Sequence, residues 1–237
     1  MDAATVAADV VVLAKSSVNI WEKYFHIPKP TGIIYSPLDS CLLVTTEEHN
    51  VIRVTPFQTS QIFAGRKTQG YRDGKGSFAM FNNPLGIALD GQGVLYVADN
   101  WNYVIRKIDR TGLVSTVVGK AGTKKLVNGP VAGASILEPR AMVFRNGSLI
   151  IIETSGTENP PLDVIRILSP DQSQISVLAG KSGRGFQDGP GLTAKFDTPL
   201  GITVDGKGIL YVADTGNHLI RTISPDSNYV STLACLK

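Results

Sequence analysis

One stretch that recurs along this chain constrains the fold more than any other feature. Its clearest copy, from Phe81 to Gly119, reads FNNPLGIALDGQGVLYVADNWNYVIRKIDRTGLVSTVVG. Four short apolar runs cover residues 86–89, 94–98, 104–108 and 114–118. These runs are rich in β-branched residues and are too short for ordinary helices. Turn formers separate them, and Asp90-Gly91 is expected to take the positive φ values of a tight hairpin. The stretch therefore predicts a four-stranded antiparallel meander.

Three further copies repeat this order of runs and turns. They start near Pro30, Pro139 and Pro199, whereas the clearest copy starts at Pro84. An Ile-Arg pair marks the third run of each copy, and its arginines are Arg53, Arg106, Arg166 and Arg221. A single meander cannot bury both of its faces, so the copies are expected to stack face to face.

Two motifs carry a resemblance to a known family. The motif LYVADxxNxxIR, at residues 95–106 and 210–221, resembles the signature of NHL repeats. The preceding motif GxxDGxGxxAxFxxP, at residues 70–84 and 185–199, resembles the long inter-blade loop of one NHL subgroup. The resemblance extends from about Pro30 to the C-terminus and implies an all-β fold, a β-propeller of four-stranded antiparallel blades. By itself it implies no single activity, because its relatives include enzymes and binding modules.

The number of repeats raises a question about closure of the ring. Closed propellers have four to eight blades, and NHL relatives usually have more than four. We therefore expect an incomplete or partner-completed ring in preference to a sealed four-bladed one. Open blade ends would leave apolar faces bare and would favour self-association.

The first 29 residues precede the propeller, which is expected to span residues 30–237. Val10–Lys15 resembles a fourth strand of a blade and predicts an orphan strand. The alternative is a short helix from Asp2 to Ala14, capped by Asp2. Periodicity does not choose between the two.

Composition suits one soluble domain, because 43% of the 237 residues are apolar. No apolar run is long enough to cross a membrane, and the N-terminus lacks the positive lead of a secretory signal. An intracellular protein without a membrane partner is expected. The two cysteines, Cys41 and Cys235, are too few for a disulfide framework or a metal cluster. They are expected to be small apolar residues near strand ends, although ring closure could bring them together.

The repeated arginines are predicted to be structural, because they recur at one position of each copy. Asp99 and Asp214 lie seven positions before Arg106 and Arg221 and are the expected partners. Asp73 and Asp188 precede glycines in the long loops and are expected to bond their own backbone. Bulky apolar residues three positions before each starting proline are predicted to plug the loops. These residues are Ile27, Phe81, Ile136 and Phe196.

The sequence offers no coherent catalytic set. Its three histidines are His26, His49 and His218. His49 and His218 fall in equivalent loops, but no His-rich or Glu-rich framework supports zinc. There is no nucleophile elbow and no phosphate-cradling glycine loop. We therefore expect no catalytic residue, no metal and no cofactor. The alternative is a metal-dependent enzyme similar to the propeller lyases and lactonases.

Positive charge is concentrated in the three long inter-blade loops. They hold ten cations and four carboxylates, whereas the whole chain has a net charge of only +3. We expect these loops to form a basic loop face that attracts an acidic protein segment, with RNA as an alternative partner. The candidate binding residues are Arg66, Tyr71, Arg72, Lys75, Lys124, Lys125, Arg184 and Phe186. The predicted function is a non-catalytic interaction scaffold. The competing interpretation is that these cations only keep exposed loops soluble.

Overall fold

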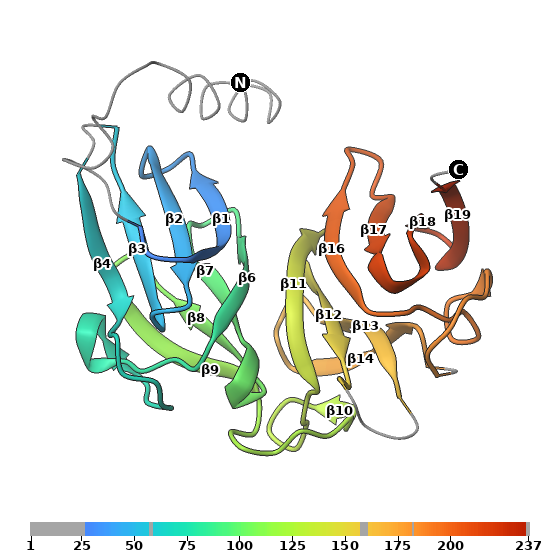
Figure 1. Ribbon diagram of the computed structural model, residues 1–237, viewed down its shortest axis with the longest axis horizontal. Helices are drawn as coiled ribbons and strands as arrows, with labels where there is room; N and C mark the ends of the chain where they lie inside the picture. Colours follow the sequence, from blue (N-terminus) through green and yellow to red (C-terminus); the bar gives the residue numbers. More distant parts are fainter. Residues whose placement is uncertain (1–26, 57–58, 157–160, 182, 236–237) are drawn as a thin grey trace.

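The computed structural model describes residues 27–56, 59–156, 161–181 and 183–235, and it confirms the predicted β-propeller fold. Four antiparallel sheets follow one another along the chain and form four blades (Figure 1). The two predictions for the N-terminal segment, a strand at Val10–Lys15 or a helix from Asp2 to Ala14, lie outside the described residues. Within the described residues, no helix is long and apolar enough to span a bilayer.

Each blade is a meander whose strands pair in chain order. Blade 1 contains β1 (Pro30–Ser36), β2 (Cys41–Thr46), β3 (Asn50–Val54) and β4 (Ser60–Gly65). Blade 2 contains β6 (Pro84–Leu89), β7 (Leu95–Asp99), β8 (Val104–Ile108) and β9 (Leu113–Gly119). Blade 3 contains β11 (Glu138–Arg145), β12 (Ser148–Thr154), β13 (Asp163–Leu168) and β14 (Gln174–Ala179). Blade 4 contains β16 (Pro199–Val204), β17 (Leu210–Asp214), β18 (Leu219–Ile223) and β19 (Tyr229–Cys235).

Three short strands that the sequence pattern did not predict extend blades 2 to 4. They are β5 (Gly74–Lys75), β10 (Gly129–Pro130) and β15 (Gly189–Pro190), and they pair with β9, β14 and β19. Each lies in the long loop before its blade, so the loop adds a fifth strand to the outer edge. Short 3-10 helices cover Gly76–Phe78 (η1), Asn100–Asn102 (η2) and Thr215–Asn217 (η3).

The hairpin turns differ in which residue takes the positive φ value. Asn146 and Gly147 both have positive φ values, 51° and 79°, as a two-residue hairpin turn requires. In blade 2 the prediction for Asp90-Gly91 is wrong, because the positive φ of 83° falls on Gly93. The carboxylate of Asp90 instead accepts hydrogen bonds from the backbone N–H of Gln92 and of Val94, both at 2.9 Å.

The core consists of three apolar clusters, one between each pair of successive blades. Between blades 2 and 3, for example, Tyr96 and Ile105 pack with Leu149 and Ile151. Phe81, Ile136 and Phe196 are fully buried, as plugs beneath the loops should be. Ile27, the fourth predicted plug, is only half-buried. Cys41 is buried with a free thiol, and because the side chain of Cys235 is outside what the structure describes, their pairing stays a prediction.

The inner strands pack in the order β1, β6, β11 and β16. In the part of the chain that the structure describes, β1 and β16 do not pack against one another in this way. Figure 1 shows blades 1 and 2 on the left and blades 3 and 4 on the right. Large apolar side chains are exposed on both terminal blades, including Ile33 and Ile62 on blade 1 and Ile220 and Leu233 on blade 4. Contact between blades 1 and 4 therefore does not close the ring.

Candidate functional site: arginine clamps and the long loops

Arg106 is fully buried in blade 2 and is held by two carboxylates. Its Nη1 donates to Oδ2 of Asp99 at 3.0 Å. Its Nε and Nη2 donate to Oδ1 of Asp73, at 3.1 and 2.6 Å. The remaining bonds go to the carbonyl oxygens of Met80 and Arg72, at 3.1 and 2.8 Å. A buried charge needs such complete pairing. We name this group, Arg106 with Asp99 and Asp73, the blade 2 arginine clamp.

Two aromatic rings complete the blade 2 clamp. The guanidinium of Arg106 lies over the ring of Tyr71 at 5.0 Å and over the ring of Phe81 at 5.1 Å. Such contacts add a cation–π attraction to the ion pairs. The hydroxyl of Tyr71 also makes a hydrogen bond of 2.9 Å with Thr116 of β9. Tyr71 therefore anchors the loop to its own blade, while 46% of its surface stays exposed.

Blade 4 repeats the clamp with equivalent residues. The buried Arg221 donates to Asp214 at 2.7 Å and to Asp188 at 3.1 and 2.6 Å. The rings of Phe186 and Phe196 lie 5.0 and 5.1 Å from its guanidinium. Both ion pairs that the sequence predicted, of Asp99 with Arg106 and of Asp214 with Arg221, are thus present.

The prediction for the loop aspartates is wrong. The carboxylates of Asp73 and Asp188 accept hydrogen bonds from the buried arginine and from the outer strand of the blade, and not, among the described residues, from the backbone of their own loop. Oδ2 of Asp73 accepts the N–H of Thr116 at 3.2 Å, and Oδ2 of Asp188 accepts that of Thr232 at 3.0 Å. The carboxylates therefore fasten each long loop to the blade that follows it.

Blade 3 carries a weaker version of the clamp. Arg166 donates to Asn128 at 2.9 Å, where the other blades have a carboxylate, and to Glu153 at 3.5 Å. Among the described residues, the Nε of Arg166 has no hydrogen-bond partner. Because Asn128 is neutral and the ion pair with Glu153 is long, Arg166 has the weakest hydrogen bonding of the three clamp arginines.

Blade 1 has no clamp, and the inclusion of Arg53 in the repeated set is wrong. Ile52 pairs with Val44 across the sheet, as Arg106 pairs with Val97 in blade 2. Arg53 lies one residue further along the strand and faces the other side of the sheet, where its guanidinium lies 4.1 Å from the ring of Phe63. A shift of one residue exchanges the two faces of a strand.

Burial shifts the pKa of two clamp carboxyls. Burial raises the pKa of Asp99 to about 6, although hydrogen bonds from Asn102, Asn82 and Arg106 oppose the shift. Burial also raises the pKa of Glu153, against the charge of Arg166. Strongly shifted carboxyls are often catalytic, but these two are fully buried and bonded to the arginines. We therefore assign them a structural role.

The predicted binding residues do not all gather on one face. Each long loop begins and ends at the same end of the propeller, but its middle runs along the outer strand. Lys75 lies opposite Leu113, at the start of β9, and so near the far end of the blade. Lys125 is exposed in the loop before blade 3. The loops thus carry their cations along the outer edges of three blades.

Two of the predicted cations are neutralised within the fold. Lys124 forms an ion pair of 2.8 Å with Glu138. Arg184 donates to the buried Asp163 at 2.8 Å and lies 3.6 Å from Asp197. Phe186 is 57% exposed, although its ring covers Arg221. Arg66, Arg72 and Lys75 are exposed and form no ion pair with any residue that the structure describes.

The two described histidines occupy equivalent turns with positive φ values, 61° for His49 and 58° for His218. Nδ1 of His49 accepts the N–H of Asn83 at 3.1 Å, and burial lowers the pKa of this histidine. Within the described ranges, no three His, Cys, Asp or Glu side chains are grouped so that they could hold a metal ion. The third histidine, His26, lies outside those ranges.

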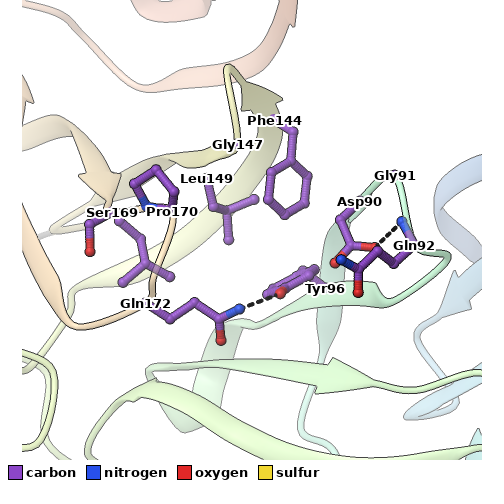
Figure 2. A pocket seen from close by; sticks show the side chains of 11 residues that line it. Asp90, Gly91, Gln92, Tyr96, Phe144, Gly147, Leu149, Ser169, Pro170 and Gln172 are labelled. Carbon is purple, nitrogen blue, oxygen red and sulfur yellow. Dashed lines mark hydrogen bonds between the residues drawn. The ribbon is translucent and has the colours of Figure 1, made fainter.

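A cavity of about 420 Å³ opens between blades 2 and 3, at the hairpin-turn end of the propeller (Figure 2). Gln172 donates to the hydroxyl of Tyr96 at 2.7 Å, and the ring of Tyr96 meets that of Phe144 edge-on at 5.0 Å. The carboxylate of Asp90 is occupied by the backbone of its own turn. Sequence patterns missed this cavity because two separate repeats form it. The hydroxyl of Tyr96, the amide of Gln172 and the carboxylate of Asp90 are thus already hydrogen-bonded within the protein.

The family comparisons agree with this architecture. The family model of the Teneurin NHL domain matches residues 69–140, and that of the NHL repeat matches residues 196–223. NHL repeat-containing protein 2 of Gallus gallus is 26% identical over 278 residues, which cover 81% of this chain and 38% of that protein. Protein SUPPRESSOR OF QUENCHING 1, chloroplastic, of Arabidopsis thaliana is 31% identical over 67% of this chain and 16% of its own length. The chain thus spans well under half the length of these relatives.

Solved structures share the fold at lower identity. A gluconolactonase of Xanthomonas campestris matches with a TM-score of 0.64 and 16% identity, over 90% of this chain and 65% of its own. An auxiliary nutrient binding protein of Bacteroides thetaiotaomicron matches with a TM-score of 0.65 and 20% identity, over 85% of this chain and 47% of its own. These likenesses concern the fold, because one fold carries many functions.

Proposed function

The chain belongs to the NHL-repeat family of β-propellers, and from this premise we propose that it is a binding module for an acidic protein segment. The binding surface is the loop strip, which we define as Arg66, Tyr71, Arg72, Lys75 and Phe78. It lies in the loop between blades 1 and 2, where η1 packs beside β4.

The outward charge of this loop carries the proposal. Residues 66–83 contain four cations and one carboxylate, a net charge of +3. That carboxylate belongs to Asp73, whose oxygens are turned toward Arg106 and Thr116. Lys67 pairs with Glu48 at 3.3 Å, so three cations remain for a partner. The side chain of Asp73 is 46% exposed, but its oxygens already accept hydrogen bonds from Arg106 and Thr116, so the three remaining cations would dominate the attraction of an acidic segment.

The loop strip is ordered before any partner arrives. The backbone N–H groups of Arg72 and Met80 each donate to the carbonyl of the other, at 3.4 and 3.0 Å. The clamp holds Asp73, and η1 follows directly. A surface that is already ordered loses less conformational entropy on binding.

Exposed aromatic surface accompanies these cations. Phe78 is 71% exposed, and Tyr71 is 46% exposed. One face of Tyr71 is occupied by Arg106 and its hydroxyl is bonded to Thr116, so this ring is poorly placed to stack on an RNA base. Mixed cationic and aromatic surface suits a peptide with acidic and apolar side chains. These observations favour a protein partner over RNA.

Charge reversal tests the proposal. We expect the double variant Arg72→Glu/Lys75→Glu to bind fluorescent poly-L-glutamate at least about tenfold more weakly than the unaltered chain, a loss of about 1.4 kcal/mol. The matched control Lys120→Glu/Lys207→Glu makes the same change of charge at exposed positions away from the loop strip. It should bind nearly as well as the unaltered chain. Fluorescence anisotropy at low and high salt measures both, because surface charge pairs weaken with salt.

Two results would overturn the proposal. Equal losses in the reversal and the control would show that only the net charge matters. Tighter binding of single-stranded polyuridylate than of poly-L-glutamate, lost in the reversal variant, would assign the loop strip to RNA. Circular dichroism melting confirms that both variants are folded.

A further inference from the structure

Blade 4 presents a face whose residues match a buried interface elsewhere in the chain. Between blades 2 and 3, Tyr96, Ala98 and Ile105 are at most 2% exposed. The equivalent residues of blade 4 are Tyr211, Ala213 and Ile220, which occupy the same positions of β17 and β18. Ile220 is 39% exposed, and Leu233, the equivalent of the buried Val117, is 59% exposed. Blade 4 therefore carries the surface of an inter-blade contact, and none of the described blades lies against it.

The glycine at the centre of this face supports the same conclusion. A Cβ at Gly32 of blade 1 would lie 2.5 Å from the carbonyl oxygen of Leu85 in blade 2. A Cβ at Gly86 of blade 2 would collide with the backbone of Arg140 in blade 3. Blade 4 has Gly201 at the same position, where a Cβ would meet only Ala213, at an ordinary 3.5 Å. Gly201 thus leaves room for the inner strand of a following blade.

Blade 1 presents the other half of such a contact. Ile33 and Val44 pair across β1 and β2, as Ile87 and Val97 pair in blade 2. Ile87 is 8% exposed because it packs against blade 1, whereas Ile33 is 59% exposed. Ile62, which is 50% exposed, pairs with Ile52, and Ile52 has the position that the clamp arginine has in blade 2. This face of blade 1 is consequently more apolar than the corresponding face of any other blade.

We propose that blade 1 of a second copy packs on blade 4, as each blade in the chain packs on the one before it. The contact joins two different faces and is therefore heterologous. Such a contact covers the blade 4 face of one copy and the blade 1 face of the other, and a heterologous contact forms a closed ring only if its rotation closes. The occupant is a second copy because this chain carries both complementary faces.

Two single variants and their mixture test the contact. Ile33→Asp places an unpaired charge on the blade 1 face and leaves the blade 4 face intact, whereas Ile220→Asp does the reverse. We expect the unaltered chain to sediment as a dimer or a larger assembly and each variant alone to be a monomer, with association weakened at least about tenfold. An equimolar mixture of the two variants should recover a dimer with one contact, because each supplies the face that the other lacks.

A conservative variant separates association from folding. Gly201→Ala adds one methyl group to an open position, so the monomer should keep its melting temperature while the association weakens; the loss should be smaller than for Ile220→Asp, because Ala141 occupies the equivalent position in the contact between blades 3 and 4. Trp101→Asp is the matched control, because Trp101 is 53% exposed on a blade 2 loop and lies on neither open face. This control should associate as the unaltered chain does.

Three outcomes of analytical ultracentrifugation would overturn the proposal. The first is an unaltered chain that stays monomeric at all concentrations. The second is self-association that survives in both single variants. The third is a mixture of the two variants that shows no heterodimer although both are folded.

Discussion

Blades 2 and 4 have almost the same residues on the face toward the next blade, yet only one of these faces is covered. Ile105 is fully buried and Ile220 is 39% exposed, although both follow the same pattern of strands. The opposite faces behave differently, because Arg106 and Arg221 are both fully buried. The comparison separates two sources of burial. The clamp face is covered by the preceding blade and by the blade's own loop, whereas the other face depends on a following blade.

This difference has a physical basis in sequence distance. Asp73 and Asp188 reach their arginines across the same number of residues, because each long loop belongs to the repeat that follows it. A clamp can therefore form within one repeat. The apolar face has no such local partner, and its stability contribution arises only when a second blade removes it from water.

Removal of the clamp arginines should have the largest effect and should be equal in the two blades. Arg106→Ala and Arg221→Ala each leave a fully buried aspartate without its cation, which costs about 3–5 kcal/mol. Urea unfolding of both variants measures the loss. A much smaller loss for Arg221→Ala would show that the blade 4 clamp needs a following blade after all.

Truncation of the apolar face should distinguish the blades. Ile105→Ala removes a fully buried side chain and should cost about 2–5 kcal/mol. Ile220→Ala should cost less than about 1 kcal/mol in dilute solution, because much of the side chain is already in water. The same unfolding experiment at rising protein concentration sharpens the comparison. A second copy on blade 4 would make the cost of Ile220→Ala increase with concentration.

Acid should weaken the blade 4 clamp by a small amount. Burial alone would raise the pKa of Asp188, but hydrogen bonds from Arg221 and Thr232 outweigh it and hold this pKa below 3.8. A carboxyl with a lowered pKa in the folded state stabilises the fold above its unfolded pKa, and this stabilisation disappears as the pH falls through the folded value. The effect should be at most about 1 kcal/mol, since the side chain of Asp188 is 38% exposed.

The variant Asp188→Asn checks the origin of this acid dependence. It reproduces the asparagine that blade 3 has at position 128. Thermal melting of the unaltered chain and the variant between about pH 5 and pH 2 should show a steeper acid decline for the unaltered chain. Parallel curves would mean that Asp188 makes no pH-dependent contribution.

Sequence patterns were sufficient to predict the four blades. In blades 2 and 4 they also predicted one of the two carboxylates that hold the clamp arginine. The four runs of the clearest repeat match β6 to β9 closely, because alternation and turn chemistry act over short distances. The pairs of Asp99 with Arg106 and of Asp214 with Arg221 follow from a fixed spacing across one hairpin. The course of the long loops did not follow from the sequence, since a two-residue strand such as Gly74–Lys75 has no recognisable pattern.

The different position of Arg53 could have been predicted from the length of the loop between the second and third strands of blade 1. Thr46 pairs with Asn50 across the loop of blade 1, whereas Asp99 pairs with Val104 in blade 2, so the blade 1 loop is one residue shorter. Arg53 and Arg106 each lie seven positions after Thr46 and Asp99, so the shorter loop places Arg53 one position further along its strand. An alignment of the arginines by residue type that ignores the strand register assigns Arg53 to the wrong face of its strand.

The clamps also define where one module ends and the next begins. Because each long loop is fastened to the blade after it, the natural boundaries fall at Gly65, Gly119 and Gly180, which end or follow the outer strands with φ values of 84°, 102° and 93°. A segment transplanted between such glycines would carry its buried arginine and the loop carboxylate or amide together. Engineers who wish to lengthen, shorten or permute this propeller should cut there and keep the starting prolines inside the transferred piece.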